Sequence, residues 1–271
     1  MTSPPPTNRI DRRLVEQPPG LWPFIPAGFP SLAFTEQLLT RLAALPIRGV
    51  ELGIPFSDPI ADGPVIQHAF AHALAAGVRL VEILAMVTRV RSAFPHPLLA
   101  MVSASIVYRR GADRFVEEAS HAGFDGLIVP DLPLEEAADL ADRCAAQNMR
   151  LSMLVAPTTP PERAQRIARA AGGFLYYVSV QGTTGERAAL PTDLAANVTR
   201  IREQSGRPVL IGFGIGTADQ VHGVCSFADG AIVGSALVRR IHEAMARGGE
   251  SGALAAAVDF VRELAVGDGG P

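Results

Sequence analysis

Eight short apolar runs alternate with stretches of helical character along the 271-residue chain, and this alternation predicts a single (β/α)8 TIM barrel. The apolar runs lack regular polar alternation, as parallel strands do when helices cover one face and the other faces a packed interior. Eight strand-and-helix units in about 250 residues also match the usual size of this barrel. The alternative, a doubly wound open sheet, usually has fewer strands.

The elements follow in order along the chain, strands as apolar runs and helices after start signals. The predicted strands are Trp22–Ala27, Gly49–Gly53, Leu98–Ser103, Gly126–Val129, Leu151–Ala156, Phe174–Val178, Pro208–Phe213 and Gly230–Val233. Helix starts are expected at Ser31 or Thr35, at Pro64, at Pro133 with Glu135 and Glu136, and at Pro161 with Glu162. Further helices are predicted over Asp193–Gln204, Ala218–Val224 and Ser235–Ala246.

No linker rich in Pro, Gly or Ser interrupts this series, so one barrel domain is expected over residues 22–266. Residues 1–21 form a polar, proline-rich extension with at most a short helix in Asn8–Gln17. Gly252–Val266 is predicted to be a final covering helix, and residues 267–271 a frayed tail.

The basic residues of the chain are all arginine: the 24 counted as Lys plus Arg include no lysine. This excludes a lysine Schiff base, lysine-bound pyridoxal phosphate and a P-loop. Carbon–carbon bond chemistry must then use acids, bases or a metal. A formal charge of −3, with the arginines dispersed, argues against binding to nucleic acid or an anionic membrane.

Cysteine usage and hydropathy indicate a cytoplasmic protein. Cys144 and Cys225 are too few for a disulfide framework or a thiolate metal site, which favours a reducing compartment. No apolar run reaches the length of a membrane span, and Met1–Pro6 lacks the order of a signal peptide.

Carboxylates after the second predicted strand are the first candidates for chemistry, because such barrels carry their active sites at the C-terminal strand ends. Glu51 lies within an apolar strand, where burial would raise its pKa and suit it to proton transfer near neutral pH. The alternative is a carboxylate satisfied by arginine or backbone N–H groups. Asp58 and Asp62 follow in a loop, where turn and cap chemistry is the alternative to function. With Glu51, this loop would bring a second carboxylate to the barrel mouth.

Glycine turns after the seventh and eighth predicted strands indicate a phosphate site. Gly212-Phe-Gly-Ile-Gly216 and Gly230-Ala-Ile-Val-Gly-Ser235 each lead into a helix and can aim backbone N–H groups at an anion. Simple tight turns are the alternative. Without lysine, a phosphate would depend on backbone N–H groups and Ser235.

Three other features have weaker support. The polar loop Ser179–Pro191 is a candidate lid, with disorder as the alternative. His68 and His72 lie four apart on a predicted outer helix, where solvated positions are favoured over a shared metal. Phe24, Tyr176 and Phe213, near strand ends, either pack in the core or contact a substrate. No cofactor or metal site is predicted.

These motifs closely resemble those of the tryptophan synthase alpha subunit family, in family order from about Asn8 to Arg262. The most specific is Glu51-Leu-Gly-Ile-Pro-Phe-Ser-Asp-Pro-Ile-Ala-Asp-Gly-Pro-Val-Ile-Gln67. The others are Pro23-Phe-Ile-Pro-Ala-Gly-Phe-Pro30, Val129-Pro-Asp-Leu-Pro-Leu-Glu-Glu136, Tyr176 with Gly182-Thr-Thr-Gly185, Gly212-Phe-Gly-Ile215 and Gly234-Ser235. The resemblance implies a (β/α)8 barrel that cleaves indole-3-glycerol phosphate to indole and glyceraldehyde 3-phosphate. It also implies an alpha2-beta2 complex, in which indole passes to a pyridoxal-phosphate-dependent beta subunit.

The resemblance also implies roles for individual residues. Glu51 matches the acid/base that protonates indole C3 and takes the proton from the side-chain hydroxyl. Asp62 matches the carboxylate that accepts the indole N–H. The phosphate-binding positions are Gly185, Gly214, Gly234 and Ser235; Thr184 is the lid residue that orients Asp62; and Phe24, Tyr176 and Phe213 form the wall of the indole pocket.

One stretch departs from the family pattern. Ser103 and Ser105 stand where the family usually has a Tyr and an Asn. Loss of the aromatic ring and the amide would loosen the indole site or change how this loop meets the beta subunit. Two alternatives to the complexed lyase stay open. One is a stand-alone indole-3-glycerol-phosphate lyase, because relatives of that kind share these motifs. The other, which the Ser103 and Ser105 departure supports, is a weakly active alpha-like module that mainly activates the beta subunit.

Overall fold

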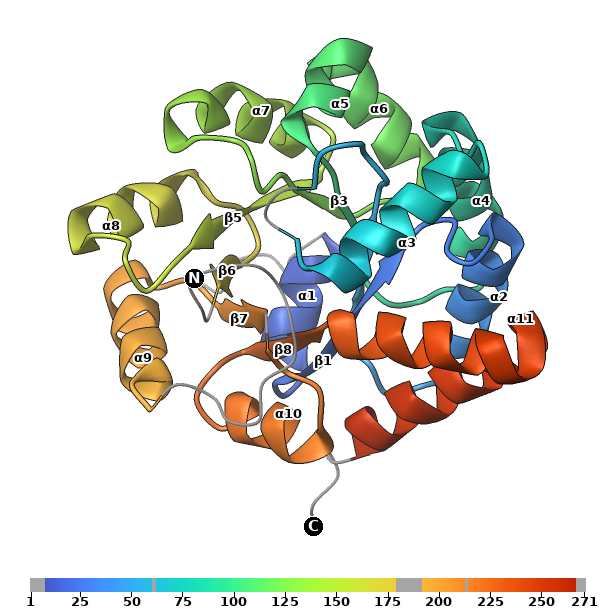
Figure 1. Ribbon diagram of the computed structural model, residues 1–271. Coiled ribbons are helices and arrows are strands. Elements are labelled where there is room, and N and C mark those ends of the chain that lie inside the picture. Colours follow the sequence, from blue (N-terminus) through green and yellow to red (C-terminus); the bar gives the residue numbers. More distant parts are fainter. Residues whose placement is uncertain (1–7, 60–61, 179–191, 213, 267–271) are drawn as a thin grey trace.

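The computed structural model describes residues 8–59, 62–178, 192–212 and 214–266, which form a closed barrel of parallel strands inside a ring of helices (Figure 1). Each strand pairs in parallel with the next, and the eighth pairs with the first. The (β/α)8 prediction is confirmed, and the open-sheet alternative is wrong. The strands are β1 (Gly20–Pro26), β2 (Val50–Gly53), β3 (Leu98–Met101), β4 (Gly126–Ile128), β5 (Arg150–Val155), β6 (Leu175–Val178), β7 (Val209–Gly212) and β8 (Gly230–Val233).

The helices of the described chain include every helix that the sequence predicted, with small shifts at their ends. They are α1 (Arg9–Glu16), α2 (Leu32–Leu42), α3 (Pro64–Ala75), α4 (Leu80–Arg91), α5 (Ala104–Arg110), α6 (Ala112–Ala122), α7 (Leu134–Ala146), α8 (Pro161–Ala170), α9 (Leu194–Ser205), α10 (Ala218–Cys225) and α11 (Ser235–Val266). The last runs as two helical segments that meet at Gly248 and Gly249, whose backbone angles are not helical.

The sequence did not single out α4, α5 and α6, and it placed the end of the third strand too late. Ser103, predicted as the last strand residue, is the N-cap of α5, and its hydroxyl accepts the N–H of Ser105. Pairing in β3 therefore ends at Met101. The start of α4 is also atypical: Arg79 is its N-cap, and Glu82 accepts the Arg79 N–H at 2.9 Å.

The barrel interior consists mainly of buried, apolar strand residues. Trp22 of β1 is fully buried, and its ring packs against Phe174 with a centroid separation of 5.6 Å. Two glycines on adjacent parts of the barrel make room for the Trp22 side chain: a β carbon at Gly49 would lie 2.0 Å from the tryptophan ring, and one at Gly230 would lie 2.9 Å from it.

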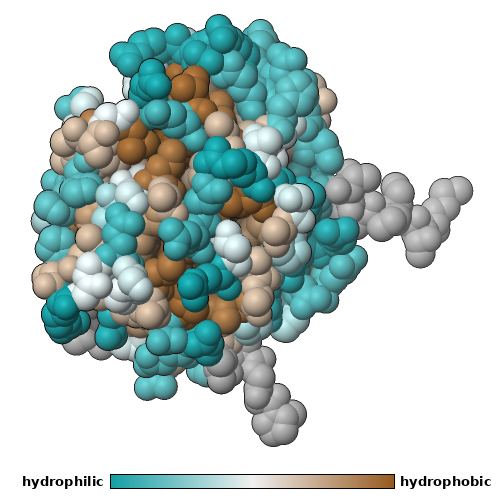
Figure 2. Space-filling view, turned by 90° about the vertical axis from the view of Figure 1, so that its right-hand side faces the viewer, coloured by the Kyte–Doolittle hydropathy of each residue, from teal (hydrophilic) through white to brown (hydrophobic). Residues whose placement is uncertain are grey.

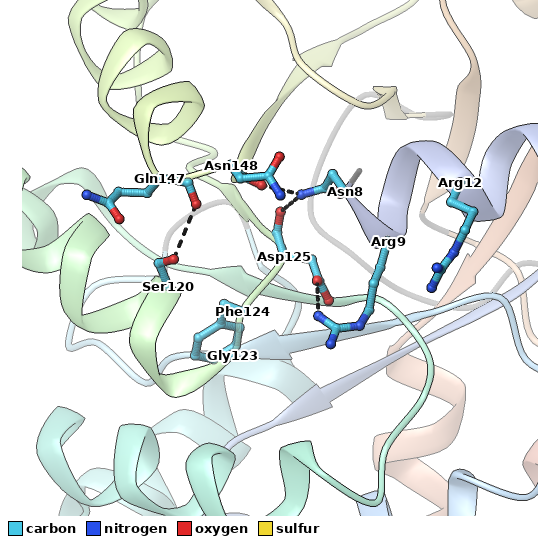
Figure 3. A pocket seen from close by; sticks show the side chains of 9 residues that line it. All are labelled: Asn8, Arg9, Arg12, Ser120, Gly123, Phe124, Asp125, Gln147 and Asn148. Carbon is cyan, nitrogen blue, oxygen red and sulfur yellow. Dashed lines mark hydrogen bonds and ion pairs between the residues drawn. The ribbon is translucent and has the colours of Figure 1, made fainter. Parts of the chain in front are cut away.

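Helix α1 closes the end of the barrel at which the strands begin, the floor of the barrel. Ile10 is fully buried there, and a β carbon at Gly126, where β4 starts, would lie 2.8 Å from it. In Figure 3 the Asn8 side chain reaches the carbonyl oxygens of Asp125 (2.9 Å) and Asn148 (2.6 Å), and Arg9 reaches the Asp125 carboxylate. The hydrogen bonds of Asn8 and Arg9 hold α1 across the floor. The opposite end of the barrel, where the strands end, is therefore the mouth.

No single helix among the described residues is long and apolar enough to cross a membrane. The pair α3 and α4 together has the length and apolar composition of a membrane span, but the two helices are bent by 100° relative to each other. The apolar residues of both helices include several that pack against the barrel, such as Ile66, Phe70, Met86 and Val87. Figure 2 shows the side of the molecule on the right of Figure 1, where hydrophilic side chains separate narrow apolar strips.

Candidate active site

Glu51 lies in the middle of β2 and is fully buried. Its register partners are Phe24 on β1 and Leu99 on β3. Within the described chain neither carboxylate oxygen has a hydrogen-bond partner, so no arginine or backbone N–H group of the described residues pairs with it. Burial raises the pKa of the Glu51 carboxyl well above its ordinary value, because ionisation would leave a charge without solvent.

Asp62 lies directly before Gly63, the N-cap of α3. Its N–H donates to the carbonyl oxygen of Pro59 at 3.0 Å, and its own carbonyl accepts the side-chain N–H of Gln67 at 2.8 Å. Burial raises the pKa of the Asp62 carboxyl to about 6. Asp58, by contrast, is exposed and accepts the Ser57 hydroxyl at 2.7 Å, as the turn alternative describes.

Tyr176 on β6 lies close enough to both carboxyl groups for their charges to affect its pKa. Its hydroxyl is buried, and its pKa is raised well above the ordinary value, first by burial and then by the charges of Glu51 and Asp62. A β carbon at Gly212 would lie 2.1 Å from the Tyr176 hydroxyl oxygen. The tyrosine hydroxyl therefore lies at the C-terminal end of β7, within electrostatic range of both carboxylates.

Phe24 on β1 lies beside two other positions at the mouth. A β carbon at Gly53 would lie 2.6 Å from its ring, and one at Gly234 would lie 3.1 Å from it. Phe24 and Glu51 are register partners in a parallel pair, so their side chains leave the same face. The ring thus lies between the end of β2 and the start of α11.

Both predicted glycine turns precede helices at this mouth. Gly214 adopts a φ of 82°, in the left-handed region that favours glycine, and the Gly216 N–H donates to the Gln220 side chain at 2.8 Å. Gly234 immediately precedes α11, which begins at Ser235. Because the first N–H groups of a helix lack intrahelical partners, the start of α11 can bind an anion.

Ser103 binds Asp131, a residue to which the sequence motifs gave no role, and Ser105 contacts Ser103. The Ser103 hydroxyl donates to the Asp131 carboxylate at 2.7 Å and lies 2.8 Å from the Ser105 hydroxyl. The same carboxylate accepts the N–H of Ala104 at 2.8 Å. Asp131 thus helps to cap α5 from the loop after β4. Its position in the motif Val129–Glu136 carries no signal for this contact, which depends on the neighbouring strand.

The remaining site predictions fall into two groups. Thr184, Gly185, Phe213 and the predicted lid loop lie outside the described residues. On α3, His68 lies beside His242 of α11, with 5.1 Å between the ring centroids, and the ring of His72 packs against Phe29 at 5.4 Å. No group of three or more His, Cys, Asp or Glu in the described ranges could hold a metal ion.

Two carboxyl groups with raised pKa values at the C-terminal strand ends of a (β/α)8 barrel are typical of the enzymes that use this fold. The profile of the family described as tryptophan synthase alpha chain matches residues 12–265. The chain belongs to this family, and it is a carbon–carbon lyase that acts on indole-3-glycerol phosphate.

Relatives and solved structures agree with this assignment. The chain is 48% identical to the tryptophan synthase alpha chain of Synechococcus sp. (strain CC9902) over 225 residues, which cover 83% of this chain and 84% of the relative. A tryptophan synthase structure from Mycobacterium tuberculosis superposes with a TM-score of 0.86 at 31% identity, covering 96% of this chain and 98% of the other. A structure of the Pyrococcus furiosus tryptophan synthase α2β2 complex has a TM-score of 0.83 at 36% identity, covering 90% and 96%.

Proposed function

We propose that Glu51 and Asp62 divide the acid–base work of indole-3-glycerol phosphate cleavage. The observation that carries this proposal is the difference between their surroundings: Glu51 lies inside a buried strand, and Asp62 lies in a loop at the start of α3. Glu51 is fully buried without a hydrogen-bond partner in the described chain, which raises its pKa well above its ordinary value and favours the protonated form, whereas Asp62, with a pKa of about 6, is mostly ionised at pH 7. Two carboxyl groups whose environments separate their pKa values are suited to opposite roles.

Glu51 gives its proton to C3 of the indole ring, and the ring becomes an indoleninium ion. The Asp62 carboxylate accepts the indole N–H and stabilises the positive charge. The Glu51 carboxylate then takes the proton from the hydroxyl on the carbon attached to C3. The bond from C3 to that carbon breaks, its electron pair returns to the ring, and indole and glyceraldehyde 3-phosphate result. This retro-aldol path uses no Schiff base, which agrees with a chain without lysine.

The other site residues hold the substrate in this proposal. Gly214, Gly234 and Ser235, with Gly185, bind the phosphate through backbone N–H groups and one hydroxyl. Phe24, Tyr176 and Phe213 form the wall of the indole pocket, and Thr184 helps to orient Asp62. Support comes from Phe24, whose ring adjoins Gly234 on one side and whose register partner is Glu51.

The partner in this proposal is a tryptophan synthase beta subunit, in an α2β2 complex in the cytoplasm. The Pyrococcus furiosus structure with TM-score 0.83 is described as such a complex. The stand-alone lyase and the activating module remain the alternatives. The second of these is favoured by Ser103, which stands where the family usually has a Tyr and whose hydroxyl binds Asp131.

One assay separates the three functions. The purified chain is incubated with indole-3-glycerol phosphate, with and without a beta subunit, and glyceraldehyde 3-phosphate is measured. Strong stimulation by the beta subunit supports the complexed lyase, and full activity alone supports the stand-alone enzyme. No cleavage in either condition, with stimulation of the beta reaction, supports the activating module.

A further inference from the structure

Gln67 in the first turns of α3 binds the loop that carries Asp62. Its side-chain N–H groups donate to the carbonyl oxygen of Asp62 at 2.8 Å and to that of Pro59 at 3.3 Å. The N–H of Asp62 donates to the same Pro59 carbonyl at 3.0 Å. Gln67 therefore contacts both ends of the turn, and both backbone polar groups of Asp62 have partners.

The helix geometry explains why a glutamine at this position can do this. Side chains on a helix lean toward its N-terminus, so a long side chain at the fourth helical position reaches back over the N-cap. The N-cap is Gly63, which offers no side chain to compete. Ile66 and Phe70 are each 2% exposed and pack α3 against the barrel, so the base of Gln67 is held by the core.

We propose that Gln67 is a positioning residue for the lyase reaction, and that its amide holds the Asp62 backbone so that the carboxylate meets the indole N–H. This inference rests on the proposed role of Asp62. Gly63, the N-cap of α3, supplies no side-chain cap of its own. Loss of the amide would leave the Asp62 carbonyl without this donor and would widen the range of carboxylate positions.

A second glutamine makes the opposite kind of contact at the other end of the site. Gln220 of α10 accepts the N–H of Gly216 through its side-chain oxygen at 2.8 Å. Gln220 therefore holds the glycine turn that is proposed to bind the phosphate. Gln67 holds the backbone of Asp62, whose carboxylate is proposed to accept the indole N–H. Phosphate contacts are made in the ground state and the transition state alike, but the charge on the indole ring develops only in the transition state. Substitution of the two glutamines should therefore affect different kinetic constants.

The test measures kcat and KM for indole-3-glycerol phosphate in the complete chain with its beta subunit. Gln67→Met keeps the length of the side chain and removes its donors; Gln67→Glu is a second variant that keeps the shape. We expect each to lower kcat by roughly 10-fold to 100-fold, because small misplacements of a reacting group have effects of this size. KM should change less than about 3-fold, whereas Gln220→Met should mainly raise KM. Gln37→Met, at an exposed position on α2, is the matched control and should match the wild type.

The decisive measurement repeats Gln67→Met in an Asp62→Asn background. If Gln67 acts through Asp62, the second substitution has no further effect on kcat. An equal loss of kcat in both backgrounds, or a kcat of either single Gln67 variant within 2-fold of the wild type, would overturn the proposal. A fully active Asp62→Asn variant would instead remove the proposed function of Asp62 itself, so the two failures are distinguishable.

Discussion

The Tyr176 hydroxyl lies over the α carbon of Gly212, so close that a β carbon there would be 2.1 Å from the hydroxyl oxygen. Tyr176 pairs in register with Leu210, and Gly212 is two residues further along the same face of β7. The absence of a side chain at Gly212 therefore lets the tyrosine ring lean toward the barrel mouth, where the carboxyl groups of Glu51 and Asp62 affect its pKa.

Substitution of Gly212 by alanine should displace Tyr176. The methyl group cannot occupy a position 2.1 Å from the hydroxyl, so the ring must move away from the carboxyl groups. We expect kcat/KM to fall at least about tenfold and the free energy of unfolding to fall by about 1–3 kcal/mol. Steady-state kinetics and urea unfolding measure both. Gly223→Ala is the control, since nothing lies within 4 Å of a β carbon there; it should be neutral or stabilising by up to about 1 kcal/mol.

Glu51→Gln should nearly abolish cleavage and leave phosphate binding intact. The amide has the same shape but cannot protonate indole C3, so we expect the rate to fall by roughly 100-fold to 10,000-fold. Glyceraldehyde 3-phosphate release measures the rate, and calorimetry with glyceraldehyde 3-phosphate measures binding. The matched control is Glu16→Gln, on the exposed surface of α1 at the opposite end of the barrel. An active Glu51→Gln enzyme would contradict the proposed mechanism.

The activity should fall as the pH drops through about 6. Burial raises the pKa of Asp62 to about 6, and below that pH the carboxyl is protonated and no longer accepts the indole N–H as an anion. A profile of kcat/KM from pH 5 to pH 8 tests this. Asp62→Asn should lower the activity and remove this fall in kcat/KM at acidic pH. If the fall persists in the variant, a group other than Asp62 causes it.

His96 at the barrel floor should make stability depend on pH in a defined window. Its Nδ1 lies 3.2 Å from the Arg13 guanidinium, which only donates, and its Nε2 lies 3.2 Å from the Ala43 carbonyl, so the ring is neutral with the proton on Nε2. Burial, then the charge of Arg13, lowers the pKa of His96 to about 4. The unfolded state, with a pKa near 6.5, binds the proton more tightly.

Stability due to His96 is therefore complete above about pH 6.5 and is lost as the pH falls toward 4, by roughly 2–3 kcal/mol. Glu51 and Asp62, whose pKa values are raised, change stability in the opposite direction, since they favour the folded state at low pH. The measurement is thus the difference in urea unfolding between the wild type and His96→Gln at pH 4.5, 5.5 and 7. A difference that does not vary with pH would refute this assignment.

The Ser103 cap should contribute more than an ordinary helix cap. Ser103→Ala removes the bond to the Ser105 N–H and leaves the Asp131 carboxylate without its hydroxyl donor. We expect a loss of about 1–2 kcal/mol in the free energy of unfolding. Ser31→Ala is the comparison, because Ser31 caps α2 through the Phe34 N–H alone. If the two losses are equal, the bond to Asp131 adds nothing; a cycle with Asp131→Ala measures it directly.

Local pattern was sufficient for much of the fold. Apolar runs with the length of strands occur wherever the barrel has a strand, because a buried strand must be apolar on both faces whatever its partners are. The three helices α4, α5 and α6 were not singled out, since Arg79 and Gly111 are not typical N-caps and Ser103 appeared to belong to a strand. Caps depend on one side chain and one backbone conformation, and the hydrophobic pattern does not contain that conformation.

The sequence by itself determined the barrel, the family and the candidate carboxylates Glu51 and Asp62, because hydrophobic spacing and a long motif are properties of neighbouring residues. Only the tertiary structure decided which distant groups meet: the Tyr176 hydroxyl over Gly212, the Ser103 hydroxyl on Asp131, and the Arg13 guanidinium on His96. These contacts depend on strand register and on how helices pack, to within a few tenths of an ångström. The sequence predicted a raised pKa for Glu51, but only the structure shows that the carboxyl group is completely buried without a partner in the described chain.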